Sequence, residues 1–114
     1  MNVNDKTVVW RRIAGDELAI SFNECGIARI DVDGKEICLV KTPDGLRACG
    51  ARCPHAGADL ANGYTDGSGR YIICPVHNYR FSLVNGRDRD GEGYFMKIYP
   101  VKTTEEGIFI GLPV

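Results

Sequence analysis

Short runs of apolar and polar residues, separated by glycine-containing turns, dominate the chain. Residues 28–33 alternate strictly between apolar and charged side chains, which is the two-residue period of a strand with one buried face. Asp33-Gly34 then predicts a tight hairpin turn, and the largely apolar residues 35–40 predict the returning strand. No long segment has the 3.6-residue period of an amphipathic helix. The pattern therefore predicts an all-β protein.

The remaining punctuation of the chain extends this pattern. Thr42-Pro43-Asp44-Gly45 and Asn85-Gly86 are typical turn sequences. Residues 16–19 favour either a helical turn or the start of a strand, and the mixed charges of residues 87–93 indicate a solvated loop. Further strands are expected at residues 8–13, 18–22, 46–49, 70–73, 80–84, 94–99 and 108–110. Together these strands predict a small antiparallel sandwich or barrel.

Length and charge limit the range of functions. A chain of 114 residues fits one domain, expected over residues 1–114, and 44% hydrophobic content suits a globular core. Lys+Arg 14 against Asp+Glu 15 lacks the strong basic excess of a dedicated nucleic-acid binder. The apolar runs are too short to span a bilayer, and the first residues do not form a signal peptide, so a cytoplasmic location without membrane association is expected.

The five cysteines argue against a secreted disulfide scaffold, because an odd number cannot pair fully within the chain. Cys25 and Cys38 fall in segments that favour strands, where a thiol is usually a small buried apolar side chain. Cys49 stands four residues before Cys53, and we interpret it as a structural thiol as well. Two cysteines, Cys53 and Cys74, remain for chemistry.

Both histidines of the chain follow these two cysteines in loops between expected strands. The first loop reads Cys53-Pro54-His55, and the second reads Cys74-Pro75-Val76-His77. Two thiolates and two imidazoles form a four-ligand set for a soft or borderline metal. Zinc modules usually combine a pair of neighbouring cysteines with a pair of neighbouring histidines, whereas here each loop supplies one of each. That division favours a binuclear iron–sulfur centre, with a structural zinc site as the alternative.

At these loops the sequence resembles the Rieske [2Fe–2S] family. The resemblance continues in the hairpin of residues 30–40, the segment 80–86 and the closing segment 99–101, so that it covers roughly residues 6–112. It implies a Rieske-type antiparallel β fold in which two loops, within about residues 45–85, form a small cluster-binding subdomain. It also implies one [2Fe–2S] cluster, with thiolate ligands on the inner iron and imidazole ligands on the outer iron. The implied ligands are Cys53, Cys74, His55 and His77.

Departures from the family narrow the expected reduction potential. Neutral imidazole ligands make the cluster less negative than four thiolates would, which raises its potential. The high-potential Rieske proteins carry two further cysteines, and Ala58 and Val76 stand at the matching positions here, so the disulfide between the loops cannot form. Tyr79 and Phe81 occupy the positions of hydroxyl donors to the cluster in those relatives. Phe81 has no hydroxyl, and we interpret Tyr79 as a packing aromatic rather than as an equivalent donor. Fewer hydrogen bonds to sulfur predict the lower half of the Rieske range.

The resemblance implies a soluble electron carrier that is not itself an enzyme. A Rieske ferredoxin would take electrons from a reductase and pass them to an oxygenase or similar acceptor. An oxygenase needs a further iron held by histidines, and none remains beyond His55 and His77. A Rieske-type small subunit of a nitrite-reductase-like complex is the alternative. The expected docking patch consists of Pro54, Ala56, Asn78 and Tyr79, and the oligomeric state stays open.

Overall fold

Three antiparallel sheets make up the computed structural model, which describes residues 8–55, 57–76, 78–89, 91 and 93–113. The first sheet has the order β1 (Val8–Ala14), β10 (Gly107–Pro113), β9 (Val101–Thr104). The second has the order β2 (Ile27–Val32), β3 (Lys35–Thr42), β4 (Gly45–Gly50), β8 (Ile98–Tyr99), and the third β5 (Tyr64–Thr65), β6 (Tyr71–Ile73), β7 (Arg80–Ser82). Two short 3₁₀ helices, η2 (Glu17–Ala19) and η3 (Leu60–Asn62), lie between strands. The predicted all-β class is confirmed.

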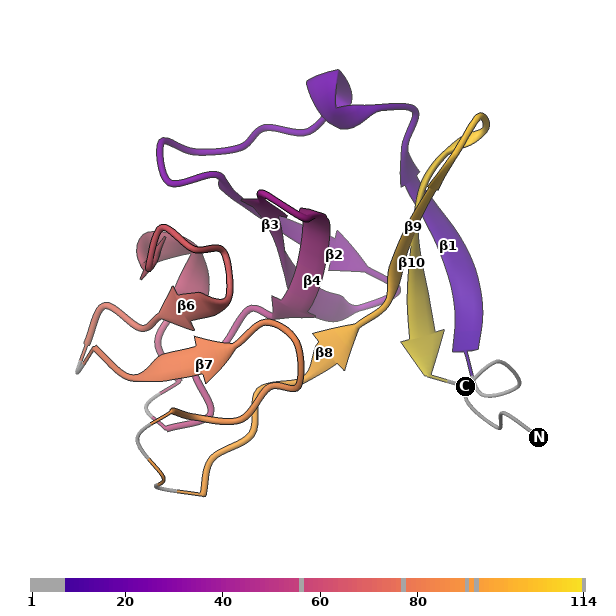
Figure 1. Cartoon of the computed structure of the whole chain (residues 1–114). Coiled ribbons are helices and arrows are strands. Elements are labelled where there is room, and N and C mark those ends of the chain that lie inside the picture. The colour runs from indigo at the N-terminus through magenta and orange to yellow at the C-terminus, as the bar shows by residue number, and fades with distance from the viewer. Residues whose placement is uncertain (1–7, 56, 77, 90, 92, 114) are drawn as a thin grey trace.

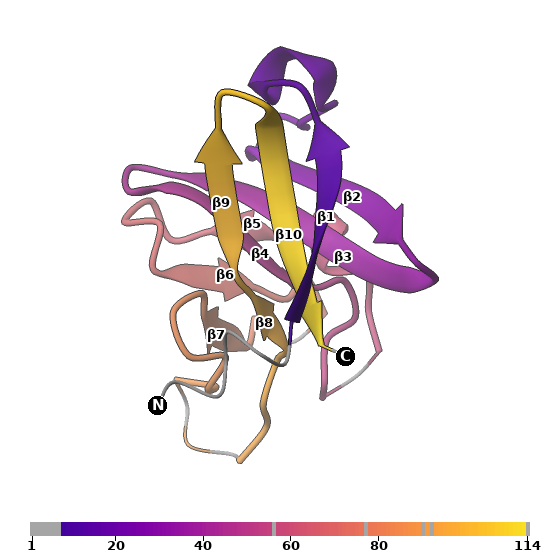
Figure 2. The same ribbon diagram turned by 90° about the vertical axis from the view of Figure 1, so that its right-hand side faces the viewer.

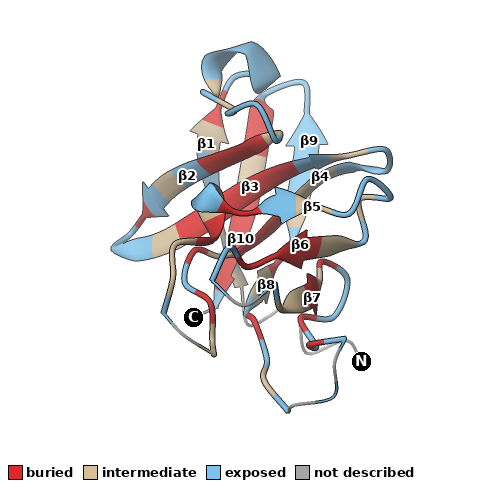
Figure 3. Ribbon diagram, turned by 90° about the vertical axis from the view of Figure 1, so that its left-hand side faces the viewer, coloured by how far each residue is buried: buried red, intermediate tan, exposed pale blue. Residues whose placement is uncertain are grey.

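The central strand β3 explains how the three sheets stack. Its run Ile37-Cys38-Leu39-Val40 is fully buried, because both faces of this strand are covered (Figure 3). On one face lies the sandwich core, shared with the sheet of β1, β10 and β9 (Figure 1). On the other lies the loop-side core, shared with β6 and β7. The sandwich core comprises Ala28, Val32, Ile37, Leu39, Ala48, Tyr99, Ile110 and Leu112. The loop-side core comprises Ile27, Cys38, Val40, Cys49, Ala51, Cys53, Leu60, Ile72, Cys74, Phe81, Leu83 and Met96.

The predicted hairpin of β2 and β3 forms as expected. Asp33 and Gly34 both have positive φ angles, 50° and 82°, which a two-residue hairpin turn of this kind requires. The register pairs Val32 with Lys35, so the alternation of residues 28–33 sends one set of side chains into the sandwich core. The neighbouring sheet of β1, β10 and β9 stands across this hairpin in the side view (Figure 2).

Two sequence predictions near the first connection are wrong. Residues 18–22 do not form a strand; the alternative prediction of a helical turn at residues 16–19 is confirmed instead. The carboxylate of Asp16 accepts a hydrogen bond from Leu18 N–H and caps η2. Cys25 is not a buried strand residue but lies in an exposed turn. The side chain of Asn23 forms that turn, because its oxygen accepts hydrogen bonds from the N–H groups of Cys25 and Ile27. In both places a local cap outweighs strand propensity.

Two predictions in the last third of the chain need correction as well. Residues 94–99 form a strand only at β8, because Tyr94 N–H donates to the carboxylate of Asp88 and Met96 N–H donates to Gly86 O. Within the predicted solvated loop, Asp88 is buried, with 9% of its surface exposed. The side chain of Asp88 thus fastens the end of this loop back onto the fold. The short strands β5 and β9 were not predicted.

In the part of the chain that the structure describes, no helix has the length and apolar character needed to cross a membrane.

Gly86 packs closely against the backbone of Met96, and this contact yields a stability prediction. Gly86 and Gly34 have nearly the same positive φ, 79° and 82°, but a Cβ on Gly86 would collide with the carbonyl oxygen of Met96, whereas one on Gly34 meets nothing within 4 Å. Gly34→Ala should cost about 1 kcal/mol of left-handed strain, and Gly86→Ala about 3 kcal/mol because the backbone must also move. Thermal unfolding followed by circular dichroism measures both. Equal unfolding temperatures for the two variants would contradict this account.

Candidate metal centre

The two predicted ligand loops have the same backbone hydrogen bonds. In the first, Cys53 N–H donates to Ala58 O at 2.8 Å and Gly57 N–H donates to Cys53 O at 2.7 Å. In the second, Cys74 N–H donates to Tyr79 O at 2.9 Å and Asn78 N–H donates to Cys74 O at 3.0 Å. Each cysteine therefore uses both its N–H and its C=O to close a loop of the same length. The sequence alone shows two loops of different spacing, C-x-H and C-x-x-H.

One residue in each loop takes the left-handed conformation that closes it. Gly57 has φ 71° and Asn78 has φ 57°, each four residues after its cysteine. Glycine adopts this region without strain, and asparagine is among the side chains that tolerate it best. In the second loop the hydroxyl of Tyr64, on β5, lies 3.2 Å from Asn78 Oδ1 and holds this residue in place. Gly57 and Asn78 thus close the two loops with the same unusual backbone angle.

Both loops rest their cysteines on the same core. Cys53 is 2% exposed and Cys74 is 0% exposed, and both belong to the loop-side core with Phe81. The loops arise at different positions along the fold: the first follows β4, and the second joins β6 to β7. Sharing one apolar base brings the two thiol side chains to the same region. Cys38 and Cys49 are buried in that core too, opposite each other in the register of β3 and β4, as structural thiols should be.

Contacts of His55 join the two loops above this core. Its ring lies 4.2 Å, centroid to centroid, from the ring of Tyr79 in the second loop. The ring of Tyr94 approaches the same imidazole edge-on at 5.1 Å. Tyr79 is thus a packing aromatic, as predicted, and Tyr94 is a contact that the sequence did not signal. The buried carboxylate of Asp88 accepts a hydrogen bond from Tyr94 N–H and so helps to position the ring that packs against His55.

The fourth predicted ligand, His77, lies outside the described residues, as does Ala56 of the expected docking patch. Among the residues that are described, no three His, Cys, Asp or Glu side chains form a group that could hold a metal ion. The described residues do supply two buried thiols with a half-buried imidazole near the second loop. This donor set fits an iron–sulfur group, which prefers thiolate ligands in apolar surroundings with imidazole as the alternative ligand.

A chain of ion pairs fastens the first loop to the sheet. Arg52, directly before Cys53, donates from Nε to Glu36 at 2.8 Å and from Nη1 to Gly57 O at 3.4 Å. Arg29 bridges Glu36 at 3.1 Å and Asp59 at 2.7 Å. Two cations and two anions thus connect β2 and β3 to both ends of the loop. We call these four residues the charged clamp.

The clamp lowers the pKa of both its carboxyl groups. For Glu36 the hydrogen bond from Arg52 is the main cause, opposed in part by desolvation and aided by the charge of Arg29. For Asp59 desolvation is the largest influence and raises the pKa, but hydrogen bonds from Ala61 N–H and Arg29 outweigh it. No local sequence pattern indicates this clamp, because its members are spread over residues 29–59.

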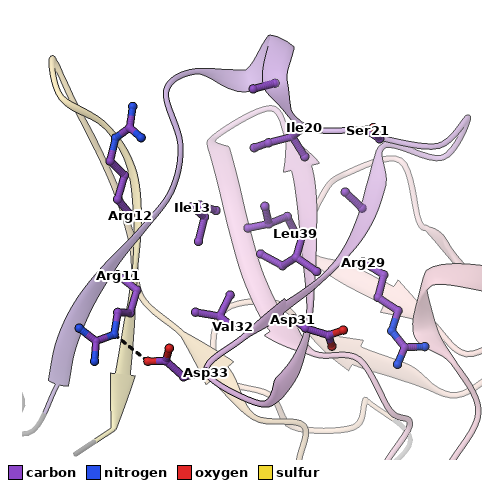
Figure 4. Close-up of a pocket in the computed structure, with 13 residues that line it drawn as sticks. Arg11, Arg12, Ile13, Ile20, Ser21, Arg29, Asp31, Val32, Asp33 and Leu39 are labelled. Atoms are coloured by element: carbon purple, nitrogen blue, oxygen red, sulfur yellow. Dashed lines mark hydrogen bonds and ion pairs between the residues drawn. The ribbon is translucent and has the colours of Figure 1, made fainter.

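A large cleft lies elsewhere in the described structure. It has a volume of about 540 Å³ and opens between β1 and β2, with Ile13 and Leu39 in its wall (Figure 4). The ion pair of Arg11 and Asp33, at 2.6 Å, crosses its rim. Of the predicted ligands that the structure describes, Cys53, His55 and Cys74, none lines it. The candidate chemistry is therefore separate from this cleft.

Comparison with known families decides what the loops belong to. A family model for the Rieske [2Fe-2S] domain matches residues 16–93, which include both loops. The chain belongs to the Rieske [2Fe–2S] family. One [2Fe–2S] cluster is accordingly the cofactor of this Rieske protein.

Curated relatives differ in how much of their length this Rieske chain spans. The ferredoxin component of the naphthalene 1,2-dioxygenase system of Pseudomonas aeruginosa is 31% identical over 90 residues, which are 78% of this chain and 85% of the relative. Cholesterol 7-desaturase nvd of Bombyx mori is 35% identical over 91 residues, 74% of this chain. The match covers only 20% of the desaturase, so that enzyme contains a large part with no counterpart here.

Solved structures agree with the Rieske fold. The ferredoxin of carbazole 1,9a-dioxygenase from Nocardioides aromaticivorans IC177 superposes with a TM-score of 0.73 at 25% identity, covering 95% of this chain and 99% of that one. A candidate NADH-dependent nitrite reductase small subunit from Mycobacterium tuberculosis has a TM-score of 0.78 at 24% identity, covering 94% and 97%. The second likeness supports the fold alone.

The charged clamp predicts a dependence of stability on pH. Because the folded pKa values of Glu36 and Asp59 lie below the unfolded ones, the clamp stabilises the fold above the ordinary carboxyl range and stops doing so as pH falls through the lowered values. Glu36→Gln should therefore unfold at a lower temperature than the wild type near neutral pH. That difference should shrink below about pH 4. Unfolding temperatures measured across this range test the expectation.

Asp44→Asn is the matched control, because this exposed carboxylate lies in the β3–β4 turn and forms no ion pair with the other described residues. It should follow the wild type at every pH. A Glu36→Gln variant that also follows the wild type at every pH would show that the clamp contributes nothing to stability.

Proposed function

We propose that the protein is a one-electron carrier of the Rieske ferredoxin type, taking electrons from a reductase and delivering them to an oxygenase or similar acceptor. The observation that carries this proposal is the pair of matched cysteine loops on one core, in a chain that spans 85% of a dioxygenase ferredoxin component. The chemistry on the final substrate then belongs to the acceptor.

The proposed ligands are Cys53 and Cys74 as thiolates and His55 and His77 as imidazoles. The burial of both cysteines supports the thiolate assignment, because the apolar base excludes water from their sulfur atoms. His55 is half-buried and thus more exposed than the two cysteines. We therefore expect electrons to leave for a partner from the imidazole side of the proposed cluster. A bound [2Fe–2S] group supplies reversible one-electron chemistry, with a potential that its ligands and hydrogen bonds set.

The surrounding residues hold the proposed ligands rather than react. Tyr79 and Tyr94 pack against the imidazole of His55 and restrict its rotation. The charged clamp fixes the ends of the first loop, and Tyr64 fixes Asn78 in the second. A carrier gains from this rigidity, because a site that moves little between its oxidised and reduced forms exchanges electrons with little rearrangement.

The ligand proposal is tested by substitution with metal and spectral readouts. Cys53→Ser should lose most of the iron and the broad visible absorption, because the protein loses a buried thiolate. His77→Cys should keep some iron and have a lower potential, since thiolate is the more electron-rich ligand. Iron analysis, visible and EPR spectra and a redox titration measure these effects.

Cys25→Ser is the matched control, because Cys25 is exposed in the turn before β2 and belongs to neither ligand loop, and the iron content of this variant should equal that of the wild type. Unchanged redox behaviour in His77→Cys would remove His77 from the ligand set. Zinc in place of iron, with no visible absorption, would overturn the carrier function. Isolation in a stable stoichiometric complex with a large flavin- or haem-containing chain would favour the nitrite-reductase-like subunit instead.

The missing hydroxyl at Phe81 yields a prediction about potential. Phe81 is 0% exposed and shares its core with both proposed thiolates, so no donor to sulfur comes from this position. The midpoint should lie in the lower half of the Rieske range of about −150 to +300 mV. Phe81→Tyr should raise it, and Phe109→Tyr on β10, the same change in another sheet, should not. A wild-type midpoint above about +200 mV would contradict the interpretation.

A further inference from the structure

A second groove, distinct from the large cleft, lies beside the first ligand loop. It has a volume of about 470 Å³. Its lining includes Lys35 and Glu36 at the start of β3, Arg52 and Pro54 at the first ligand loop, and Phe95 and Lys97 before β8. We call it the basic groove. Pro54 stands between Cys53 and His55, so whatever occupies the groove also touches the first loop.

The charges of the basic groove do not cancel. Glu36 is the only acidic residue among those described in its lining, and it is already bonded to Arg29 and Arg52 of the charged clamp. Lys35 and Lys97 are exposed, and no ion pair of the described structure includes either of them. Two lysine charges are therefore available to an incoming anion, on a protein whose formal net charge is −1.

An apolar side chain stands at the edge of the groove. Phe95 is 61% exposed, more than any other aromatic side chain among the described residues. The guanidinium of Arg87 lies 5.4 Å from the centre of its ring, which places a further cation beside this aromatic side chain. An exposed aromatic ring beside cations is a common composition of protein docking sites, where aromatic residues and arginine are enriched.

We propose that the basic groove docks an acidic surface segment of the protein redox partner, with an apolar side chain of that segment covering Phe95. The inference rests on the proposed carrier function and extends it by naming the chemistry of the partner surface. Charge complementarity favours an acidic segment, because Lys35, Lys97 and Arg87 lack anionic partners in the described structure. The few cations and the exposed ring favour a protein over a polyphosphate chain, whose binding depends on many phosphate contacts.

A peptide probe tests this proposal on the cluster-containing protein. The probe is a fluorescein-labelled peptide of glutamates around one leucine, compared with a neutral twin in which glutamine replaces glutamate. Fluorescence polarisation at an ionic strength of about 0.01 M, where the Debye length is about 30 Å, measures binding. The acidic probe should bind and the neutral twin should not. Lys97→Glu should weaken binding of the acidic probe about fivefold or more, because it replaces attraction by repulsion at close range.

Two further variants separate docking from general charge effects. Lys102→Glu makes the same change in net charge on β9, in the sheet of β1, β10 and β9, and should leave binding of the acidic probe nearly unaltered. Phe95→Ser should weaken binding of the leucine-containing probe while leaving that of an all-glutamate probe unchanged. Equal weakening by Lys97→Glu and Lys102→Glu would overturn the proposal. So would binding of an oligothymidine of matched charge as tightly as the acidic peptide.

Electron-transfer kinetics connect the groove to the carrier role. Oxidation of the reduced protein by ferricyanide, an anion, should slow in Lys97→Glu about fivefold at low salt and match the wild type at about 1 M salt, where charges are screened. Lys102→Glu should behave as the wild type. If Lys97→Glu changes nothing while the protein still cycles reversibly, the docking proposal fails and the carrier function stands. If the protein holds no reducible cluster, the carrier function itself fails.

Discussion

The structure depends on holding two cysteines from separate parts of the chain against one apolar base. Cys53 and Cys74 each use their backbone N–H and C=O groups for hydrogen bonds within their own loop. Neither cysteine therefore forms backbone hydrogen bonds to a neighbouring sheet with these groups. What brings the loops together is the loop-side core, together with the contact between His55 and Tyr79. Because this core also contains Cys38 and Val40 of β3, the position of the ligand loops is tied to the central strand of the fold.

Burial of β3 on both faces fixes the position of the ligand loops relative to this strand. A strand with one solvated face can shift against its neighbour, whereas each residue of 37–40 fills one of two cores. A shift by one residue would exchange the two sets, placing Leu39 among the loops and Cys38 in the sandwich core. The register of the β2–β3 hairpin, fixed by Asp33 and Gly34, therefore also sets the base on which the ligand loops rest.

Sequence reasoning reached the features that local pattern encodes. The hairpin at Asp33-Gly34, the all-β class and the paired Cys-His loops each rest on neighbouring residues, and the family assignment is confirmed. The ligand set itself stays a prediction, with His77 outside the described residues. Features that depend on distant residues were missed. No local pattern around Asp88 indicates that its carboxylate accepts a hydrogen bond from Tyr94 N–H. Likewise, no local pattern around Arg52 indicates its ion pair with Glu36.

The charges around the first loop divide into two kinds with different consequences. The charged clamp contains two cations and two anions in contact, so its field largely cancels at the distance of the proposed ligands. It can fix the loop without strongly favouring either oxidation state. Lys35 and Lys97 are not cancelled, but they are exposed, and water and salt screen them. Their attraction acts on an approaching anion more than on the site beneath. The fold thus assigns the paired charges to holding the loop and leaves Lys35 and Lys97 for the proposed docking, while Glu36 and Arg52 of the charged clamp also line the basic groove.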